Sequence, residues 1–83
     1  KVTWAKLRFS PRAARWVATQ SWHSKQKSET DKGGSYILSL PYSNDRELIM
    51  DILKFGPDVE VLEPVALRKR VREQLAAAAK LYR

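Results

Sequence analysis

Basic and aromatic side chains alternate with apolar ones near the N-terminus. The alternation predicts a strand that presents Trp4, Lys6 and Arg8 on one face, and Lys25 and Lys27 of a second predicted strand extend this set. Aromatic and basic residues interleaved on a sheet can stack on bases and neutralise phosphates, as in RNA-recognition folds. We favour the alternative that Trp4 packs under the last helix, because the third strand lacks the run of aromatics typical of ribonucleoprotein strands.

The first predicted helix presents Arg12, Arg15 and Trp16 on its outer side. Arg12, near the helix N-terminus, can hold an anionic ligand together with free backbone amides. Trp16 can anchor a partner or offer a planar stacking surface. An equally supported alternative is a partly buried tryptophan covered by the aliphatic stems of the two arginines.

The last predicted helix carries a basic run opposite an apolar stripe. Arg68, Lys69, Arg70 and Arg72 form the run. An amphipathic helix of this kind can dock a subunit or contact nucleic acid. A solvated outer face is the commonest explanation for such a run, so both interpretations stay open.

The sequence offers no catalytic or metal-binding constellation. It contains no cysteine and a single histidine, His23, which excludes thiolate chemistry and a histidine cluster. It has no serine elbow and no spaced histidine pair. Asp45, Glu47 and Asp51 share one predicted helix, where support of the helix N-terminus and a solvated face are the simpler explanations. We therefore expect a protein that is not an enzyme and uses no metal or cofactor.

Charge is distributed unevenly along the 83 residues, whose net charge is +7. Residues 1–32 carry eight Lys or Arg against two acids, residues 33–63 carry two against six, and residues 64–83 carry six against one. Such segregation indicates basic and acidic surfaces that attract each other, an anionic partner, or both. Ordinary solvated faces are an equally good explanation.

The length fits a single domain over residues 1–83, with no room for a second core. The chain begins with Lys1 rather than Met, so we expect it to be part of a longer protein. Its longest apolar run, around Ala76–Ala79, is far shorter than the roughly 20 residues that span a bilayer. We expect a cytoplasmic protein without membrane contact.

Local signals place the boundaries of four strands and three helices. Ser10-Pro11 is a typical helix start, and Asp31-Lys32-Gly33-Gly34 a typical hairpin turn. Asn44 with Glu47 predicts a capping box, and Gly56-Pro57 a helix end. The expected elements are a strand at 2–9, a helix from Ser10 to about Trp22, strands at 23–31 and 35–42, a helix from Asn44, a strand at 59–63 and a helix at about 64–82.

The apolar positions of these elements predict one core. The strands and the first two helices have inward or shared-face positions at Thr3, Ala5, Leu7, Phe9, Ala13, Ala14, Val17, Ala18, Tyr36, Leu38, Leu40, Leu48, Ile49, Ile52, Leu53 and Phe55. The last helix has an apolar stripe at Leu67, Val71, Leu75, Ala78 and Tyr82.

The order of elements predicts an α+β fold of the ferredoxin-like type. A βαββαβ chain forms a four-stranded antiparallel sheet, and right-handed crossovers put its two helices on one face. The extra C-terminal helix follows this unit. The second face of the sheet stays open unless that helix or a partner covers it.

An ordered set of motifs resembles one known family, the WCX domain, which is the C-terminal extension of bacterial regulators that carry a WYL domain. The resemblance covers essentially the whole chain, and its most specific stretch is Phe55–Arg68. The motifs are Phe9-Ser10-Pro11 followed by Ala-Ala-Arg-Trp-Val, the Asp-Lys-Gly-Gly turn, Leu48-Ile49, Leu53, Phe55-Gly56-Pro57-Asp58-Val59-Glu60-Val61-Leu62-Glu63-Pro64 and Leu67-Arg68.

The resemblance implies a longer parent protein. Such regulators have an N-terminal winged helix-turn-helix that binds DNA, then a WYL domain that senses a ligand, and then this ferredoxin-like module, which contributes to dimerisation and to the ligand site. Neither the DNA-reading helices nor the WYL signature occurs in these 83 residues. The family has no uniform ligand motif to transfer, so the candidate residues above rest on their chemistry.

We therefore expect a C-terminal regulatory, effector-sensing and oligomerisation module of a WYL-domain transcriptional regulator. Its expected partners are a second copy in a homodimer, the WYL domain of the same or the partner subunit, and an anionic effector or nucleic acid. The parent protein would bind DNA. The alternative function is a single-stranded nucleic-acid-binding module that uses the open basic and aromatic sheet face.

Overall fold

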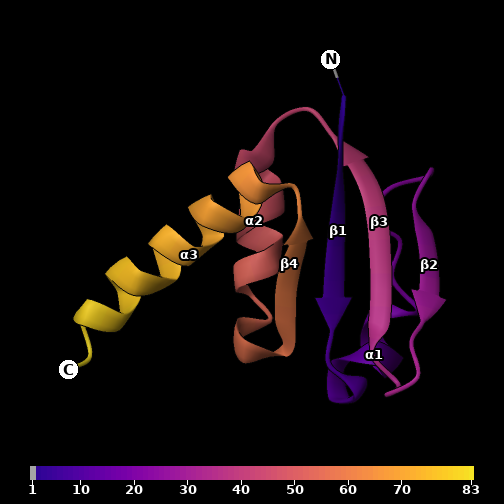
Figure 1. Ribbon diagram of the computed structural model, residues 1–83, viewed down its shortest axis with the longest axis horizontal. Helices are drawn as coiled ribbons and strands as arrows, with labels where there is room; N and C mark the ends of the chain where they lie inside the picture. The colour runs from indigo at the N-terminus through magenta and orange to yellow at the C-terminus, as the bar shows by residue number, and fades with distance from the viewer. Residues whose placement is uncertain (1) are drawn as a thin grey trace.

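The computed structural model describes residues 2–83, which form one four-stranded sheet and three α-helices (Figure 1). The expected domain over residues 1–83 begins with Lys1, which lies outside the described residues. The elements are β1 (Thr3–Phe9), α1 (Pro11–Val17), β2 (Lys27–Thr30), β3 (Tyr36–Tyr42), α2 (Asp45–Leu53), a 3-10 turn at Gly56–Asp58, β4 (Val59–Glu63) and α3 (Val65–Lys80).

The strand order is β2-β3-β1-β4, and every neighbouring pair is antiparallel. Each β-α-β crossover therefore skips one strand position, which is the ferredoxin-like arrangement. The predicted fold class is confirmed. β1 is central, and Leu7 lies between Leu38 of β3 and Val61 of β4.

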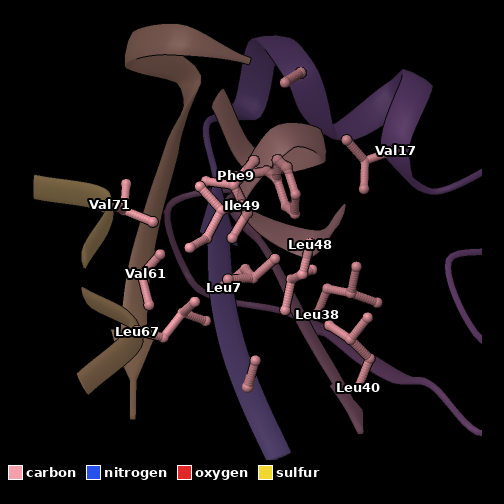
Figure 2. Packing of buried hydrophobic residues seen from close by; sticks show 13 residues of the cluster. Leu7, Phe9, Val17, Leu38, Leu40, Leu48, Ile49, Val61, Leu67 and Val71 are labelled. Carbon is pink, nitrogen blue, oxygen red and sulfur yellow. The ribbon is translucent and has the colours of Figure 1, made fainter. Parts of the chain in front are cut away.

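The hydrophobic core lies on the helical face of the sheet (Figure 2). Alternation along β1 buries Ala5, Leu7 and Phe9 there, as the sequence predicts, whereas Thr3 is exposed. α1 and α2 cover this face, and their buried side chains are part of the same cluster. The full set is Ala5, Leu7, Phe9, Ala13, Val17, Leu38, Leu40, Leu48, Ile49, Ile52, Val61, Leu67 and Val71.

The first helix is shorter than predicted, because it ends at Val17 rather than near Trp22. The Thr19 hydroxyl and backbone N–H both donate to the Trp16 carbonyl, which closes the last turn. The chain then folds back so that Trp22 packs against Phe9 and Phe55, with ring centroids 5.7 and 5.9 Å away. Burial of a large aromatic side chain outweighs the few hydrogen bonds that about five more helical residues would add.

The hairpin of β2 and β3 forms as predicted, although β2 covers only Lys27–Thr30 of the expected 23–31. Asp31 organises its turn, since Oδ1 accepts hydrogen bonds from the N–H groups of Gly33 and Ser35. Gly34 has φ +88°, a left-handed conformation that favours glycine. Ahead of β2, the Gln26 side chain accepts hydrogen bonds from the N–H groups of Trp22 and His23. The backbone of this stretch is therefore engaged in local hydrogen bonds and does not pair with β3.

The second helix begins after Asn44, whose side chain accepts from Arg46 N at 2.9 Å. The helix cap is thus where the sequence predicts it. Within residues 2–83, the hydrogen bonds do not include the one from the Asn44 N–H to the Glu47 carboxylate that would complete a capping box. Gly56 adopts φ +53° just after the helix, in agreement with the predicted helix end.

The last helix packs on the domain through its first half only. Leu67 and Val71 are buried beside β4, and Arg70 pairs with Asp45 of α2 at 2.6 Å. A 16-residue helix is about 24 Å long, whereas five strand residues extend about 17 Å, so α3 outruns β4. Beyond Val71, the predicted apolar stripe is therefore exposed at Leu75, Ala78 and Tyr82. On the first helix, the expectation that Ala18 faces inward is wrong, because Ala18 is exposed, and Ala14 is only partly buried.

Candidate functional site

The sheet face opposite α1 and α2 is not covered by a helix, and we call it the open face. Strand register arranges its side chains in two rows that cross the sheet. Lys27, Ser39, Lys6 and Glu63 form the first row; Glu29, Ile37, Arg8 and Glu60 form the second. β4 contains one extra residue, Leu62, between the partners of Lys6 and Leu7, and this bulge keeps Glu60 and Glu63 on the same face.

The first row brings two lysines to either side of a hydroxyl group. Lys6 and Lys27 are both register partners of Ser39, and within residues 2–83 neither forms an ion pair. Two shallow hollows of about 310 and 210 Å³ are lined by these three residues, with Trp4 and Glu63 beside the first and Glu29 and Ile37 beside the second. Ammonium and hydroxyl donors around a hollow are suited to an anionic group.

Trp4 lies beside this row, two residues before Lys6 on the same face of β1. Its side chain is 43% exposed, and the ammonium group of Lys27 lies 5.5 Å from its ring centroid. The expectation that Trp4 packs under the last helix is wrong, because α3 packs on β4 and α2 and its C-terminal half extends away from the sheet (Figure 1). Trp4 therefore offers an aromatic surface that can stack on a planar group.

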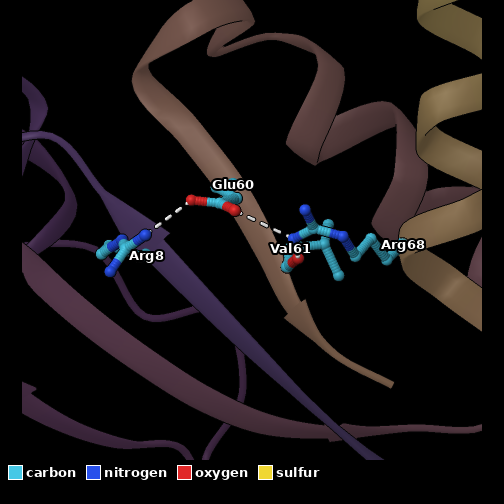
Figure 3. Close-up of polar contacts among 4 residues, drawn as sticks. All are labelled: Arg8, Glu60, Val61 and Arg68. Carbon is cyan, nitrogen blue, oxygen red and sulfur yellow. Dashed lines mark hydrogen bonds and ion pairs between the residues drawn. The ribbon is translucent and has the colours of Figure 1, made fainter. Parts of the chain in front are cut away.

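The second row is occupied by an ion-pair network (Figure 3). Arg8 donates to Glu60 Oε1 at 2.7 Å, and Arg68 of α3 donates to Glu60 Oε2 at 2.9 Å and to the Val61 carbonyl at 2.8 Å. The hydrogen bonds from Arg68 and then Arg8 hold the pKa of Glu60 below its ordinary value. Arg8 lies on the predicted face, but its positive charge is neutralised by the ion pair with Glu60.

The structure separates the eight candidate residues into three places. Trp4, Lys6, Arg8 and Lys27 share the open face, as the alternation predicts. Lys25 lies before β2 and lines a groove beside the end of β3. The remaining three, Arg12, Arg15 and Trp16, lie on α1 behind the sheet.

The N-terminus of α1 already holds an internal anion. Ser10 caps the helix by accepting from Ala13 N at 3.2 Å, and its hydroxyl donates to Asp58 Oδ1 at 2.8 Å. Arg12 donates to Asp58 Oδ2 at 2.7 Å. The hydrogen bond from Arg12, and next that from Ser10, lower the pKa of Asp58. The hydrogen bond to Asp58 and its negative charge in turn raise the pKa of Arg12. The Asp58 carboxylate thus takes the position that an external anion would need.

Arg15 and Trp16 form an exposed pair on the outer side of α1. The guanidinium carbon of Arg15 lies 6.0 Å from the ring centroid of Trp16, which is 56% exposed. The arginine stem therefore shields only part of the indole, and Trp16 is not a core residue. The choice between a partner anchor and a solvated surface tryptophan stays open.

Sequence reasoning missed the residues that shape the open face around the lysines. The alternation of Leu38 and Leu40 already places Ser39 on the opposite face, so this signal was present in the sequence. The ion pairs of Glu60 with Arg8 and Arg68 could not be predicted from local sequence patterns, because they depend on the order of the strands in the sheet.

Two general findings complete the description. Within residues 2–83, no three His, Cys, Asp or Glu side chains gather where they could hold a metal ion. Among the helices of the described chain, none has the length and apolar character needed to cross a bilayer.

The fold and the open face define a class, the small ferredoxin-like α+β domain with an uncovered sheet face. The chain belongs to the WCX domain family, whose model matches residues 1–79. This match confirms the resemblance inferred from the ordered motifs.

The chain is also similar to a curated protein, the uncharacterized HTH-type transcriptional regulator YobV of Bacillus subtilis (strain 168). The two are 39% identical over 54 residues, which make up 65% of this chain and 17% of the relative. The chain thus spans less than a fifth of the length of that regulator.

Proposed function

We propose that this chain is the C-terminal regulatory module of a DNA-binding transcriptional regulator, which senses an anionic effector and contributes to oligomerisation. Membership of the WCX family and similarity to an HTH-type regulator support the regulatory context. The helix-turn-helix and the WYL domain would lie in other parts of the longer protein, which would act in the cytoplasm as a homodimer. The module itself would perform no catalysis.

The row Lys27–Ser39–Lys6 is the observation that carries the effector site. Two lysines that form no ion pair within residues 2–83 flank a hydroxyl on the open face. The ammonium groups of Lys6 and Lys27, on strands that flank β3, repel each other weakly, and an anion bound between them relieves this repulsion. Trp4, which lies beside the row, would stack on a planar part of the same effector.

A small anion fits this face better than a nucleic-acid strand. Arg8 and Arg68 are engaged by Glu60, and Glu29 and Glu63 stand at the ends of the two rows. Phosphate groups along a strand would meet these carboxylates. The exposed Trp4 ring is the one observation that favours the alternative, a module for single-stranded nucleic acid.

Salt dependence of binding separates the two functions quantitatively. With a fluorescein-labelled thymidylate hexamer as the probe, two phosphate contacts would lower affinity roughly sevenfold between about 50 and 200 mM salt. A dedicated strand-binding face with six contacts would lose roughly 300-fold over the same range. Micromolar binding with the steeper loss would establish the alternative.

Binding of inorganic pyrophosphate, measured by calorimetry, tests the proposed function itself. We expect Lys6→Gln and Lys27→Gln each to weaken binding about tenfold, the effect of losing one charge-assisted contact. Lys69→Gln on α3 is the matched control, because it removes the same charge from an exposed position away from the sheet face. Equal effects of all three substitutions would mean that only net charge matters, and would refute the site.

A further inference from the structure

The C-terminal half of α3 and the three residues after it, residues 72–83, form an amphipathic segment whose apolar side chains are all exposed; we call it the α3 tail. Its apolar stripe continues the one that buries Leu67 and Val71, yet Leu75 is 45% and Tyr82 87% exposed. Figure 1 shows the segment extending away from the sheet and from α2. An apolar helical stripe that is buried in its first half and exposed in its second indicates a contact with another molecule.

A groove of about 520 Å³ lies beside the C-terminal end of β3, and we call it the β3 groove. It exists because β2 is short: pairing with β3 ends at Ser39, so the end of β3 has no neighbour on that side. Its apolar lining includes the side chains of Trp4, Trp22, Tyr42 and Leu48.

Acidic groups from α2 border the β3 groove. Glu47 forms no ion pair with another residue of the described chain, and Asp51 contacts only Lys54, at 3.5 Å with both side chains largely exposed. Lys25 and His23 lie at another part of the rim. The α2 side of the groove is therefore a negative border next to an aromatic floor.

The α3 tail has the complementary character. Arg72 flanks the stripe one residue after Val71, and Glu73 lies on the opposite side of the helix. Arg83 follows Tyr82 directly, just beyond the end of the helix. Arg72 has no ion-pair partner within residues 2–83. The exposed side chains of Leu75 and Tyr82 thus lie beside basic groups, as a negative and aromatic groove requires.

The tail of one molecule cannot enter its own groove. α3 packs on the β4 edge of the sheet, whereas the groove lies beside β3 on the side that faces β2, with β1 between the two. Parallel association of two α3 tails is disfavoured, because each carries Arg72 beside its stripe and Arg83 after Tyr82. The cleft between α3 and β4 is lined by Arg68, Arg72 and Glu60, and the carboxylate of Glu60 is already paired with Arg8 and Arg68. The occupant with matching charge is an α3 tail from another copy.

We propose that two copies of this chain exchange α3 tails, so that the tail of each lies in the β3 groove of the other. Leu75 and Tyr82 would pack on the aromatic floor, and Arg72 would meet Glu47 and Asp51 of the partner copy. Each copy gives one tail and one groove, so the contact closes as a two-fold dimer. This inference rests on the oligomerisation part of the proposed function and names its surface.

Sedimentation equilibrium over about 1 µM to 1 mM protein, the range of weak to moderate association, tests the exchange. Wild-type chain is expected to approach twice its 9.6 kDa mass at the upper end. Arg72→Glu, and separately Glu47→Arg combined with Asp51→Arg, should each raise the dimer Kd about tenfold or more by setting like charges opposite each other. Lys69→Glu, which makes the same charge change away from the stripe, should leave the Kd within about twofold.

Mixing the two charge-reversed proteins gives the decisive measurement. In the heterodimer, Glu at position 72 of one copy meets the two arginines of the other, and the native Arg72 meets the native Glu47 and Asp51. Both contacts become attractive, so the mixture should dimerise although neither protein does alone. A mixture that stays monomeric would overturn the pairing.

Two further outcomes would also overturn the proposal, and they are distinguishable. A wild-type dimer that persists in Arg72→Glu and in the groove variant would reject the tail exchange but support oligomerisation through another surface. A wild-type chain that remains monomeric at the highest concentration would reject the exchange and also the oligomerisation part of the proposed function, while leaving the pyrophosphate measurement unaffected.

Discussion

The two leucines of the α3 stripe differ in burial, and this difference predicts a large contrast in stability. Leu67 is 1% exposed within the core cluster, and Leu75 lies two turns further along the same helix. Leu→Ala in a fully buried site costs about 2–5 kcal/mol, so we expect about 3 kcal/mol for Leu67→Ala. The half-exposed Leu75 should lose about 1 kcal/mol or less, since alanine also favours the helix slightly.

The contrast is measured by urea unfolding followed by far-ultraviolet circular dichroism, at about 1 µM protein so that association does not contribute. For a domain of this size, 3 kcal/mol corresponds to a shift in Tm of roughly 12–24 °C. Equal destabilisation by the two substitutions would refute the reasoning, because the tail would then pack on its own domain. A loss below about 1 kcal/mol for Leu67→Ala would show that α3 is not anchored at all.

Two more predictions concern the polar contacts and the hairpin. The pKa values of Asp58 and Glu60 are lower in the folded chain than their ordinary values of 3.8 and 4.5, so the two carboxylates stabilise the fold fully above those ordinary values. This stabilisation is lost as the pH falls through the lower folded pKa values, and the urea midpoint should therefore decline between about pH 5 and 2. The decline should be smaller in Asp58→Asn. Gly34→Ala should cost about 1–2 kcal/mol in the same urea assay because of its positive φ, whereas Gly33→Ala, where φ is not positive, should be close to neutral; equal losses would contradict the assigned turn.

Much of the fold followed from local patterns in the sequence. Period-two alternation placed Leu7 and Phe9 in the core, and cap residues such as Ser10 and Asn44 marked the helix starts. The order of elements then left few topologies, of which the ferredoxin-like one is observed. These features are short-range, so a single sequence contains them.

The errors occurred where a distant contact competes with a local preference. Trp22 lies in a stretch with helical pattern, but its packing on Phe9 and Phe55 draws it out of the helix. Likewise, the stripe through Leu75 has the same period as that through Leu67, and only the length of β4 determines which part is buried. Neither the early end of α1 nor the exposure of the second half of α3 can be predicted from the spacing of apolar residues.

The candidate site was predictable in its chemistry and less so in its composition. Strand alternation correctly grouped Trp4 with Lys6, and the hairpin added Lys27. The role of Asp58, which engages Arg12 from 46 residues away, required the three-dimensional structure. Counting cations in the sequence therefore overstates how many are free to bind a ligand.

The central claim is that an anion binds between Lys6 and Lys27 on the open face, and its location is measured most directly by amide chemical-shift changes in ¹⁵N-labelled protein titrated with pyrophosphate. We predict shifts confined to the neighbourhood of Lys6, Lys27 and Ser39, and their disappearance in the Lys6→Gln, Lys27→Gln double variant. Shifts centred on α1 or α3, or unchanged shifts in the double variant, would contradict the claim.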